Sequence, residues 1–281
     1  MPTLLCALPR SNPSTSTRGS ADPRPSHSRT GRSARVRAAG RIAVIAVAAT
    51  AMLAGLTPPA TQAADDSAPQ AGDARWKMVF ADSFGGSAIN ESDWVVFDGP
   101  GPRARENVIV RNGKLLLRTR QIDGEWLAAG VGSSRAVVQQ YGKYVARVKV
   151  EKGAGTRAVA LLWPNDGSWP PEVDFFEIGG DDPRRQTNRI TNHYPPGNQM
   201  EHLSKPGDYT KWHNVGVEWT ADAMKFTLDG RVIGTITENI PQQPMWFGLQ
   251  SGLETGQYAP SPDNYKSVDY KAKWVKVYDL A

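Results

Sequence analysis

Three carboxylates lie close together in the sequence, at Glu172, Asp174 and Glu177. Apolar residues separate them in the stretch WPPEVDFFE, which begins at Trp169. This alternation predicts a β-strand with one apolar face and one acidic face. Carboxyl groups gathered on one face can serve as nucleophile and as general acid and base. A solvated acidic strand face without any chemistry is the alternative interpretation.

A regular strand would place Glu172 and Asp174 on one face and Glu177 on the other, because side chains alternate with a period of two. One extra residue near Phe175 or Phe176, a β-bulge, returns Glu177 to the acidic face and keeps both Phe rings in the core. The Cα atoms of the two Glu residues are then roughly 13 Å apart. Retaining glycosidases need carboxyl groups about 5–5.5 Å apart, so the long Glu side chains must lean toward each other over Asp174.

The segments on either side of this strand favour a functional role. Pro170 and Pro171 end a loop just before the strand, where proline interrupts no ladder hydrogen bond, and Trp169 stands at the entrance to the acidic face. Gly179 and Gly180 end the strand just beyond the third acid. The acids are therefore expected on a short strand bordered by loops.

Residues 1–63 have the features of a secretion leader. Eight Arg residues precede an apolar run from Ile42 to Leu56, and Thr61-Gln62-Ala63 fits a small-residue cleavage site. An uncleaved membrane anchor is the alternative, although the run is short for a membrane span. We expect a secreted, extracellular protein with a flexible tail at 64–73 and a single catalytic β-sandwich domain at 74–281.

The basic charge of the whole chain belongs to this leader. The sequence has 33 Lys and Arg against 28 Asp and Glu, whereas residues 64–281 have 25 against 27, a net charge of −2. The electrostatic footprint of nucleic-acid binding is therefore missing after the leader. The only cysteine is Cys6, and the later histidines, His193, His202 and His213, form no zinc-binding motif. We expect a monomer without metal, cofactor or nucleic-acid partner, and without membrane contact once the leader is removed.

From Trp76 onward the pattern is one of strands and turns without an amphipathic helix. Asn112-Gly113, Asp123-Gly124 and Asp229-Gly230 each stand between alternating runs and predict two-residue hairpin turns. Further strands are expected at 142–150, 158–162, 173–178, 214–220, 245–250 and 273–279. Short strands at such regular spacing predict an all-β antiparallel sandwich.

The chain from Trp76 to Tyr278 resembles glycoside hydrolase family 16, and within it the laminarinase-like branch whose catalytic strand has the bulged ExDxxE form. The resemblance covers an opening strand and loop, a first hairpin, a frame strand, the two active-site strands, a following hairpin and a closing strand. These segments read VFADSFGGSAINESDW, NVIVRNGKLLLR, YGKYVARVKV, LLWPNDGSWPPEVDFFE, WHNVGVEWT with FTLDGRVIG, and WVKVYD.

The resemblance implies a concanavalin-like jelly roll of two curved antiparallel sheets with an open cleft for an extended polysaccharide. It implies that Glu172 is the nucleophile, that Glu177 is the general acid and then the base, and that Asp174 assists between them. Like charges at close range should raise the proton affinity of one Glu, which agrees with this division. The expected activity is retaining endo-hydrolysis of a β-linked polysaccharide, with β-1,3-glucan as the expected substrate.

The chain departs from the family pattern at three places. Pro171 precedes the nucleophile position, where Gly or Asp is usual. Lys273 replaces an Asp that helps to bind a structural calcium in the family, so we expect no calcium there. Ala160 stands where an aromatic residue is often found, with Trp163 three residues on.

Four further residues are candidates for substrate binding. Trp169 and Trp163 border loops next to the acidic strand and are expected as sugar platforms, with core packing as the alternative. His193, in TNHY, is expected to face the cleft or to have a structural role. Asn107 matches a family position that contacts sugar hydroxyls, although an Asn there also suits a turn cap.

Two other functions are compatible with the same residues. A carbohydrate-binding sandwich without turnover would keep the fold and lose the activity, since fold does not fix function. A transglycosylase of the same family would transfer the sugar to another chain instead of to water.

Overall fold

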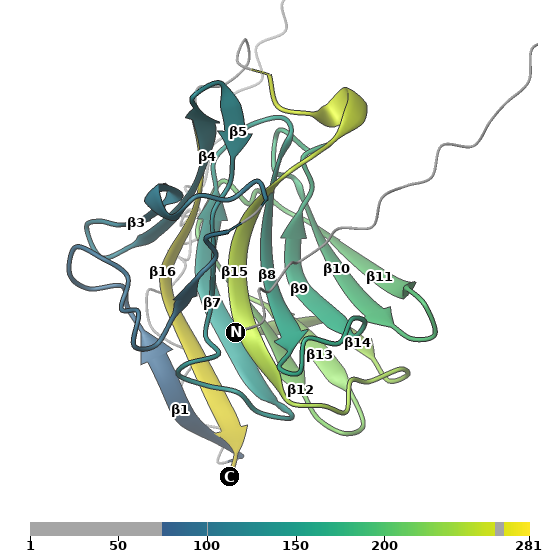
Figure 1. Ribbon diagram of the computed structural model, residues 1–281. Coiled ribbons are helices and arrows are strands. Elements are labelled where there is room, and N and C mark those ends of the chain that lie inside the picture. The colour runs from purple at the N-terminus through teal and green to yellow at the C-terminus, as the bar shows by residue number, and fades with distance from the viewer. Residues whose placement is uncertain (1–74, 100, 262–266) are drawn as a thin grey trace, which may run out of the picture. The chain divides into compact units, whose positions relative to one another are not determined.

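A computed structural model describes residues 75–99, 101–261 and 267–281 of the chain. The expected leader at 1–63 and the expected tail at 64–73 lie outside the described residues. Two antiparallel sheets face each other across an apolar core (Figure 1). The all-β jelly-roll sandwich predicted from the sequence is therefore confirmed.

One sheet has nine strands among the described residues. They are β1 (Trp76–Asp82), β3 (Val108–Val110), β4 (Leu115–Ile122), β5 (Glu125–Leu127), β7 (Gly142–Val150), β12 (His213–Trp219), β13 (Met224–Leu228), β14 (Arg231–Ile236) and β16 (Ser267–Leu280). Their order is β14-β13-β12-β7-β16-β4-β3, with β1 paired to β16 and β5 paired to β4.

The other sheet, which carries the three acids, has seven strands in the described ranges. They are β2 (Val95–Val96), β6 (Gly130–Gly132), β8 (Thr156–Pro164), β9 (Glu172–Ile178), β10 (Thr187–Tyr194), β11 (Gln199–Pro206) and β15 (Met245–Leu253). Their order is β11-β10-β9-β8-β15-β6-β2, so β9 lies inside the sheet and not at its edge (Figure 1). Two short 3₁₀ helices, η1 (Arg105–Asn107) and η2 (Gly256–Tyr258), complete the elements.

All three predicted hairpin turns are present. Asp123-Gly124 joins β4 to β5, Asp229-Gly230 joins β13 to β14, and Asn112-Gly113 lies at the tip between β3 and β4. Both residues of each pair have positive φ, between 49° and 85°. This is the conformation that type I′ hairpin turns require, and Asn, Asp and Gly tolerate it better than other residues. Strand β11 was not among the predicted strands.

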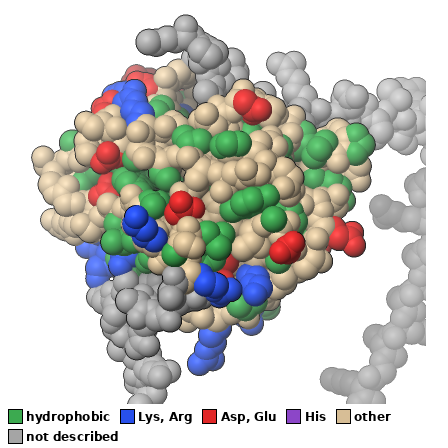
Figure 2. All heavy atoms as spheres, turned by 90° about the horizontal axis from the view of Figure 1, so that it is seen from below, with side chains coloured by type: hydrophobic (Ala, Val, Ile, Leu, Met, Phe, Trp, Pro, Cys, Tyr) green, Lys and Arg blue, Asp and Glu red, His purple; other side chains and the backbone are tan. Residues whose placement is uncertain are grey.

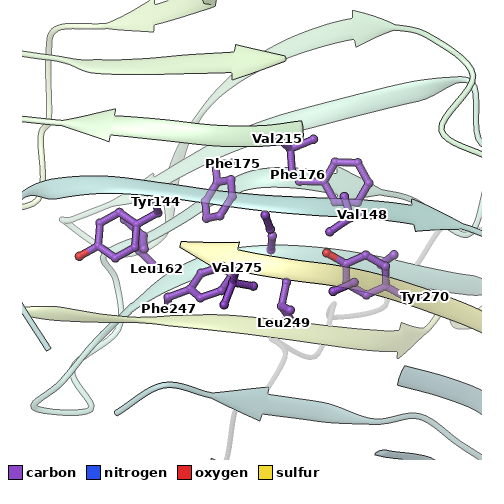
Figure 3. Close-up of a cluster of buried hydrophobic side chains, with 14 of the residues drawn as sticks. Tyr144, Val148, Leu162, Phe175, Phe176, Val215, Phe247, Leu249, Tyr270 and Val275 are labelled. Atoms are coloured by element: carbon purple, nitrogen blue, oxygen red, sulfur yellow. The ribbon is translucent and has the colours of Figure 1, made fainter. Parts of the chain in front are cut away.

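The core lies between the two sheets and is rich in aromatic rings. Figure 3 shows side chains from both sheets meeting there, among them Phe175, Phe176 and Phe247 from the seven-stranded sheet. Phe175 stacks on Phe247 with ring centroids 5.7 Å apart, and Phe176 stacks on Tyr270 at 5.9 Å. Consecutive residues Phe175 and Phe176 therefore both point inward, which a regular strand does not allow.

A β-bulge in β9 explains this arrangement. On the β10 side, Asp174 pairs with Thr191 and Glu177 with Arg189, so Phe175 and Phe176 together oppose the single residue Ile190. On the β8 side the register shifts at the same point. The bulge predicted near Phe175 or Phe176 is thus confirmed, and it turns the third acid to the face of the first two.

A buried arginine fixes the end of β9. Arg185 has no exposed surface, and its guanidinium donates hydrogen bonds to the carbonyl oxygens of Glu151, Thr156 and Gly179. Gly179 is the residue that follows the last residue of β9. Because a buried guanidinium is costly unless its donors are satisfied, this contact holds the loop after β9 close to the β7–β8 turn.

The described surface carries charges of both signs. On the face seen in Figure 2, Lys and Arg side chains lie interspersed with Asp and Glu among neutral and apolar groups. In the part of the chain that the structure describes, no helix has the length and apolar character needed to cross a membrane.

The bulge makes Phe176 a test residue, because a regular strand would expose this ring and the bulged strand buries it. We expect Phe176→Ala to lower the free energy of unfolding by about 3–5 kcal/mol, as a cavity replaces a fully buried ring. Urea denaturation monitored by tryptophan fluorescence measures the change. Tyr258→Ala, at a ring that is 49% exposed, is the control and should change stability by less than about 0.5 kcal/mol. Equal effects of the two substitutions would contradict the bulge.

Candidate active site

The three acids lie on the outer face of the seven-stranded sheet. Their neighbours on β10 are His193 beside Glu172, Thr191 beside Asp174 and Arg189 beside Glu177. These neighbours are alternate residues of a regular strand, so the acids occupy successive positions on one face. The intervening apolar residues of β9 belong to the core.

Glu172 is held by the tryptophan just before the strand. Trp169 Nε1 donates a hydrogen bond of 2.8 Å to Glu172 Oε2. The Trp169 ring also lies against His193, with ring centroids 5.8 Å apart. The predicted site residues Trp169 and His193 are therefore brought together with the first acid.

Asp174 is the most buried acid of the three, with 5% of its surface exposed. His193 Nε2 lies 3.4 Å from Asp174 Oδ2, while His193 Nδ1 is 2.8 Å from Asn198 Oδ1. Because an amide oxygen only accepts, Nδ1 must carry a proton. Burial alone would lower the pKa of His193, but Asp174, Asn198 and the charge of Glu172 raise it to about 9. His193 is thus a cation beside the acids at neutral pH.

Glu177 is oriented mainly from β10. Its backbone N–H donates to Asn188 Oδ1 at 2.9 Å, and Thr191 Oγ1 lies 3.4 Å from its carboxylate oxygen Oε2. Arg157, Arg189 and His193 also act on this carboxylate and favour its ionised form. Arg189 is itself paired with Asp181 at 2.6 Å, and Arg157 with Glu254 at 3.3 Å.

Burial and mutual repulsion make the two glutamates hold protons more strongly. Burial and then the charge of Asp174 raise the pKa of Glu172 to about 8 and that of Glu177 to about 7. The free site therefore retains a proton near neutral pH, as the sequence predicted for one Glu. Burial outweighs the 2.8 Å hydrogen bond from Trp169 Nε1, which by itself lowers the pKa of Glu172 because a donor favours the ionised carboxylate.

An aromatic floor lies next to the acids on the same face. Leu162 pairs with Val173, so the next residue of β8, Trp163, faces the same side as Glu172. Trp163 is 8% exposed and lies against Trp246 of β15, with ring centroids 6.5 Å apart, and Phe97 continues the row at 5.9 Å from Trp246. The sequence-based candidate Trp163 is thus near the acids, but mostly covered.

Glycines make room for this floor. A Cβ at Gly130 would stand 2.3 Å from the Phe97 ring, and a Cβ at Gly132 or Gly248 would stand 2.8 or 2.9 Å from the Trp246 ring. The Phe97 and Trp246 rings therefore occupy space over strand positions that have no side chain. Neither Phe97 nor Trp246 was recognised in the sequence, although glycines that alternate within a strand were an available signal.

Two polar residues at the edge of this floor were also not predicted from the sequence. Arg103 lies 5.7 Å over the Phe97 ring and donates a 2.8 Å hydrogen bond to Gln250 Oε1. Gln250 alternates with the core residue Leu249 and so shares the outer face with Trp246.

The expected sugar contact of Asn107 is contradicted by its burial. Asn107 has no exposed surface. Its amide donates to the carbonyl oxygen of Leu127 at 2.9 Å, and its side-chain oxygen accepts from Arg120 Nε at 2.8 Å. The residue instead ties η1 to the neighbouring strands, because a buried amide must find internal partners.

The described residues contain no group of three or more His, Cys, Asp or Glu side chains placed to hold a metal ion. The chemistry available on this face is that of carboxyl groups, two of them with raised pKa values, with a histidine and an aromatic floor beside them. Such a set can attack, protonate and deprotonate a substrate.

The fold is similar to that of several solved glucanase structures. The endo-β-1,3-glucanase from Pyrococcus furiosus aligns with a TM-score of 0.64 and 21% identity, over 74% of this chain and 97% of that one. The laminarinase catalytic domain from Thermotoga maritima aligns with a TM-score of 0.64 and 20% identity, over 74% and 99%. At these identities the likeness concerns the fold.

Curated relatives are similar in sequence. The endo-1,3-1,4-beta-glycanase ExsH of Rhizobium meliloti is 26% identical over 208 residues, which are 69% of this chain and 44% of the relative. The beta-glucanase of Fibrobacter succinogenes is 30% identical over 151 residues, 50% of this chain and 43% of the relative. The chain thus spans less than half the length of these two relatives. The model of the Glycosyl hydrolases family 16 matches residues 103–276, which is more than half of the chain and includes β9 with its three acids, and the chain belongs to that family.

Proposed function

We propose that this chain is a secreted, retaining endo-glycoside hydrolase that cleaves internal bonds of a β-linked glucan, with β-1,3-glucan as its substrate. One observation carries the proposal: the bulge in β9 brings Glu172, Asp174 and Glu177 onto one face of a sheet. Family membership supports the reaction class. The secretion part rests on the leader-like sequence of residues 1–63.

The proposed reaction has two steps in which the two glutamates exchange a sugar and a proton. Glu172 forms a bond to the anomeric carbon while the glycosidic bond breaks, and Glu177 gives its proton to the leaving oxygen. Glu177 then takes a proton from a water molecule, whose oxygen attacks the same carbon and releases Glu172. Two inversions retain the configuration. Asp174 lies between the two glutamates, and its charge favours the protonated form that Glu177 needs in the first step.

The substrate proposal draws on the aromatic floor and on the relatives. The row of Trp163, Trp246 and Phe97 begins beside Glu172. The two tryptophans are mostly covered, whereas the half-buried Phe97 ring leaves apolar surface that suits the C–H face of a sugar ring. The relative ExsH carries the name endo-1,3-1,4-beta-glycanase, and the similar structure from Pyrococcus furiosus carries the name endo-β-1,3-glucanase.

Incubating the mature protein with β-1,3-glucan, mixed-linkage glucan, agarose and carrageenan tests the proposal. We expect new reducing ends and a rapid fall in the viscosity of β-1,3-glucan, because an endo-acting enzyme cuts within the chain. Saturable glycan binding without cleavage at several pH values would contradict the proposal in favour of a binding module. Products longer than the starting oligosaccharides would indicate transglycosylation.

Substitution of each glutamate should reveal its role. Glu172→Gly removes the nucleophile and leaves space for a small anion, so azide should restore turnover of an activated aryl glycoside with inverted configuration. Glu177→Ala should lose roughly 10²–10⁴-fold on unactivated glucan and should give the retained azide product, because the covalent intermediate still forms. Proton NMR of the products assigns the anomers.

Circular dichroism of both variants must match the wild type for the comparison to hold. If Glu172→Gly gave the retained azide product and Glu177→Ala the inverted one, the roles of Glu172 and Glu177 would be reversed. Full activity of Glu177→Ala on glucan would remove this residue from the reaction.

The buried acids also predict how stability depends on pH. The pKa of Glu177 is about 7 in the folded chain, against an ordinary value of 4.5, so the folded state binds more protons than the unfolded state between these limits. The free energy of unfolding therefore falls as the pH rises through this window. Glu177→Gln, which stays neutral, should flatten the decline of Tm between pH 5 and 7 and exceed the wild-type Tm at pH 8.

Differential scanning fluorimetry at each pH measures this effect. Glu238→Gln, at an exposed position on the chain, is the control and should keep the wild-type slope. A Glu177→Gln variant with the wild-type slope would mean that Glu177 is not held in its protonated form.

A further inference from the structure

We propose that Thr191 and His202 act as positioning residues for Glu177, forming a hydrogen-bond chain that supports this carboxyl group in both of its protonation states. The inference rests on the proposed function, in which Glu177 alternates between acid and base. It adds two residues that neither the sequence reading nor the comparisons assign to the site.

The hydrogen-bond chain crosses the three neighbouring strands β9, β10 and β11. Thr191 on β10 pairs with Asp174 of β9 on one side and with His202 of β11 on the other. Thr191 Oγ1 lies 3.4 Å from Glu177 Oε2 and 3.1 Å from His202 Nδ1. The first contact is long in the free protein, as is common for catalytic hydrogen bonds before substrate binds.

Burial restricts the partners of the Thr191 hydroxyl. The residue is 3% exposed, so its hydroxyl depends on protein partners, and these two contacts are the ones it has in the described residues. An unsatisfied buried hydroxyl is costly. The hydroxyl should therefore remain in the chain throughout the reaction.

A hydroxyl suits this position because it donates and accepts at the same time. When Glu177 is ionised, Thr191 donates its proton to the carboxylate and accepts the Nδ1–H of His202. When Glu177 is protonated, the carboxyl donates to Thr191, and Thr191 donates to the unprotonated Nδ1 of His202. Both directions satisfy every member of the chain, and no proton is gained or lost by Thr191.

His202 is suited to the outer end of the chain because it is exposed. Its ring can exchange protons with water and so adopt the form that each state of Glu177 requires. Ionised Glu177 should favour the Nδ1–H form of His202, and by reciprocity that form should favour ionised Glu177.

Other charged groups also act on Glu177, and their effects must be distinguished from that of the hydrogen-bond chain. Asp174 on β9 opposes its ionisation, whereas Arg157 on β8 and Arg189 and His193 on β10 favour it. None of these groups acts through the Thr191 hydroxyl. Removing that hydroxyl therefore isolates the contribution of the hydrogen-bond chain.

NMR of the His202 ring in the free protein tests the hydrogen-bond chain without any substrate, because the ¹⁵N chemical shift of Nδ1 reports whether this nitrogen carries a proton. His202→Ala identifies the His202 signals. We expect Glu177→Gln to change the Nδ1 shift in the wild-type background, because the carboxylate at the end of the hydrogen-bond chain is gone. In the Thr191→Val background the same substitution should change the shift by less than half as much. An equal change in both backgrounds would show a through-space effect and would overturn the inference.

Kinetics on β-1,3-glucan provide the second measurement. Thr191→Val should move the basic limb of the kcat/KM profile to higher pH by about half a unit, because a donor to ionised Glu177 is lost. It should also lower kcat roughly tenfold, less than the ~10²–10⁴-fold loss of the acid itself. Thr191→Ser should restore both values, and His202→Ala should shift the limb in the same direction.

Ser204→Ala is the matched control, since Ser204 is the next residue on the same face of β11 and is exposed. It should leave the profile unchanged. If the wild type cleaves glucan and the basic limb of the kcat/KM profile does not move in either Thr191→Val or His202→Ala, the inference is overturned. A wild-type protein that cleaves no glucan would instead contradict the proposed function. The NMR measurement would still test the hydrogen-bond chain, because it needs no substrate.

Discussion

The site depends on one local constraint, the bulge that places two consecutive phenylalanines on the same side of β9. Phe175 and Phe176 both enter the core, where they stack on Phe247 and Tyr270. Without the extra residue, Glu177 would point into this core, where an ionised carboxyl group without partners is very costly. The packing energy of the two rings therefore fixes the register that brings Glu177 to the outer face.

Gathering three acids on that face opposes stability, and the neighbouring strands supply the compensation. Trp169 donates to Glu172, the His193 cation lies beside Asp174, and Arg189 of β10 acts on Glu177. The compensation is partial, because the pKa of both glutamates remains raised. Incomplete compensation is useful here, since a general acid must keep its proton at the pH at which it works.

Local patterns in the sequence predicted features that depend on neighbours along the chain. The three turns and the bulge follow from Asn-Gly and Asp-Gly pairs and from the spacing of the acids. Contacts between strands were harder to predict, because they depend on the register in which the strands pair. Asn107, a candidate for substrate binding or for a turn cap, is buried at the end of η1. Thr191 and His202 meet only because β10 and β11 pair. The floor of Trp246 and Phe97 was missed because its signal lies in glycines on other strands.

The central claim is that the bulged strand presents Glu172 as the nucleophile, with Glu177 on the same face. Trapping with a 2-deoxy-2-fluoro-β-glycosyl fluoride tests it most directly, because the fluorine slows the breakdown of a covalent glycosyl-enzyme. Digestion and tandem mass spectrometry then locate the label. The account predicts a single label on the carboxylate of Glu172, and none in the Glu172→Gln variant. A label on Glu177, or inactivation that persists in Glu172→Gln, would contradict it.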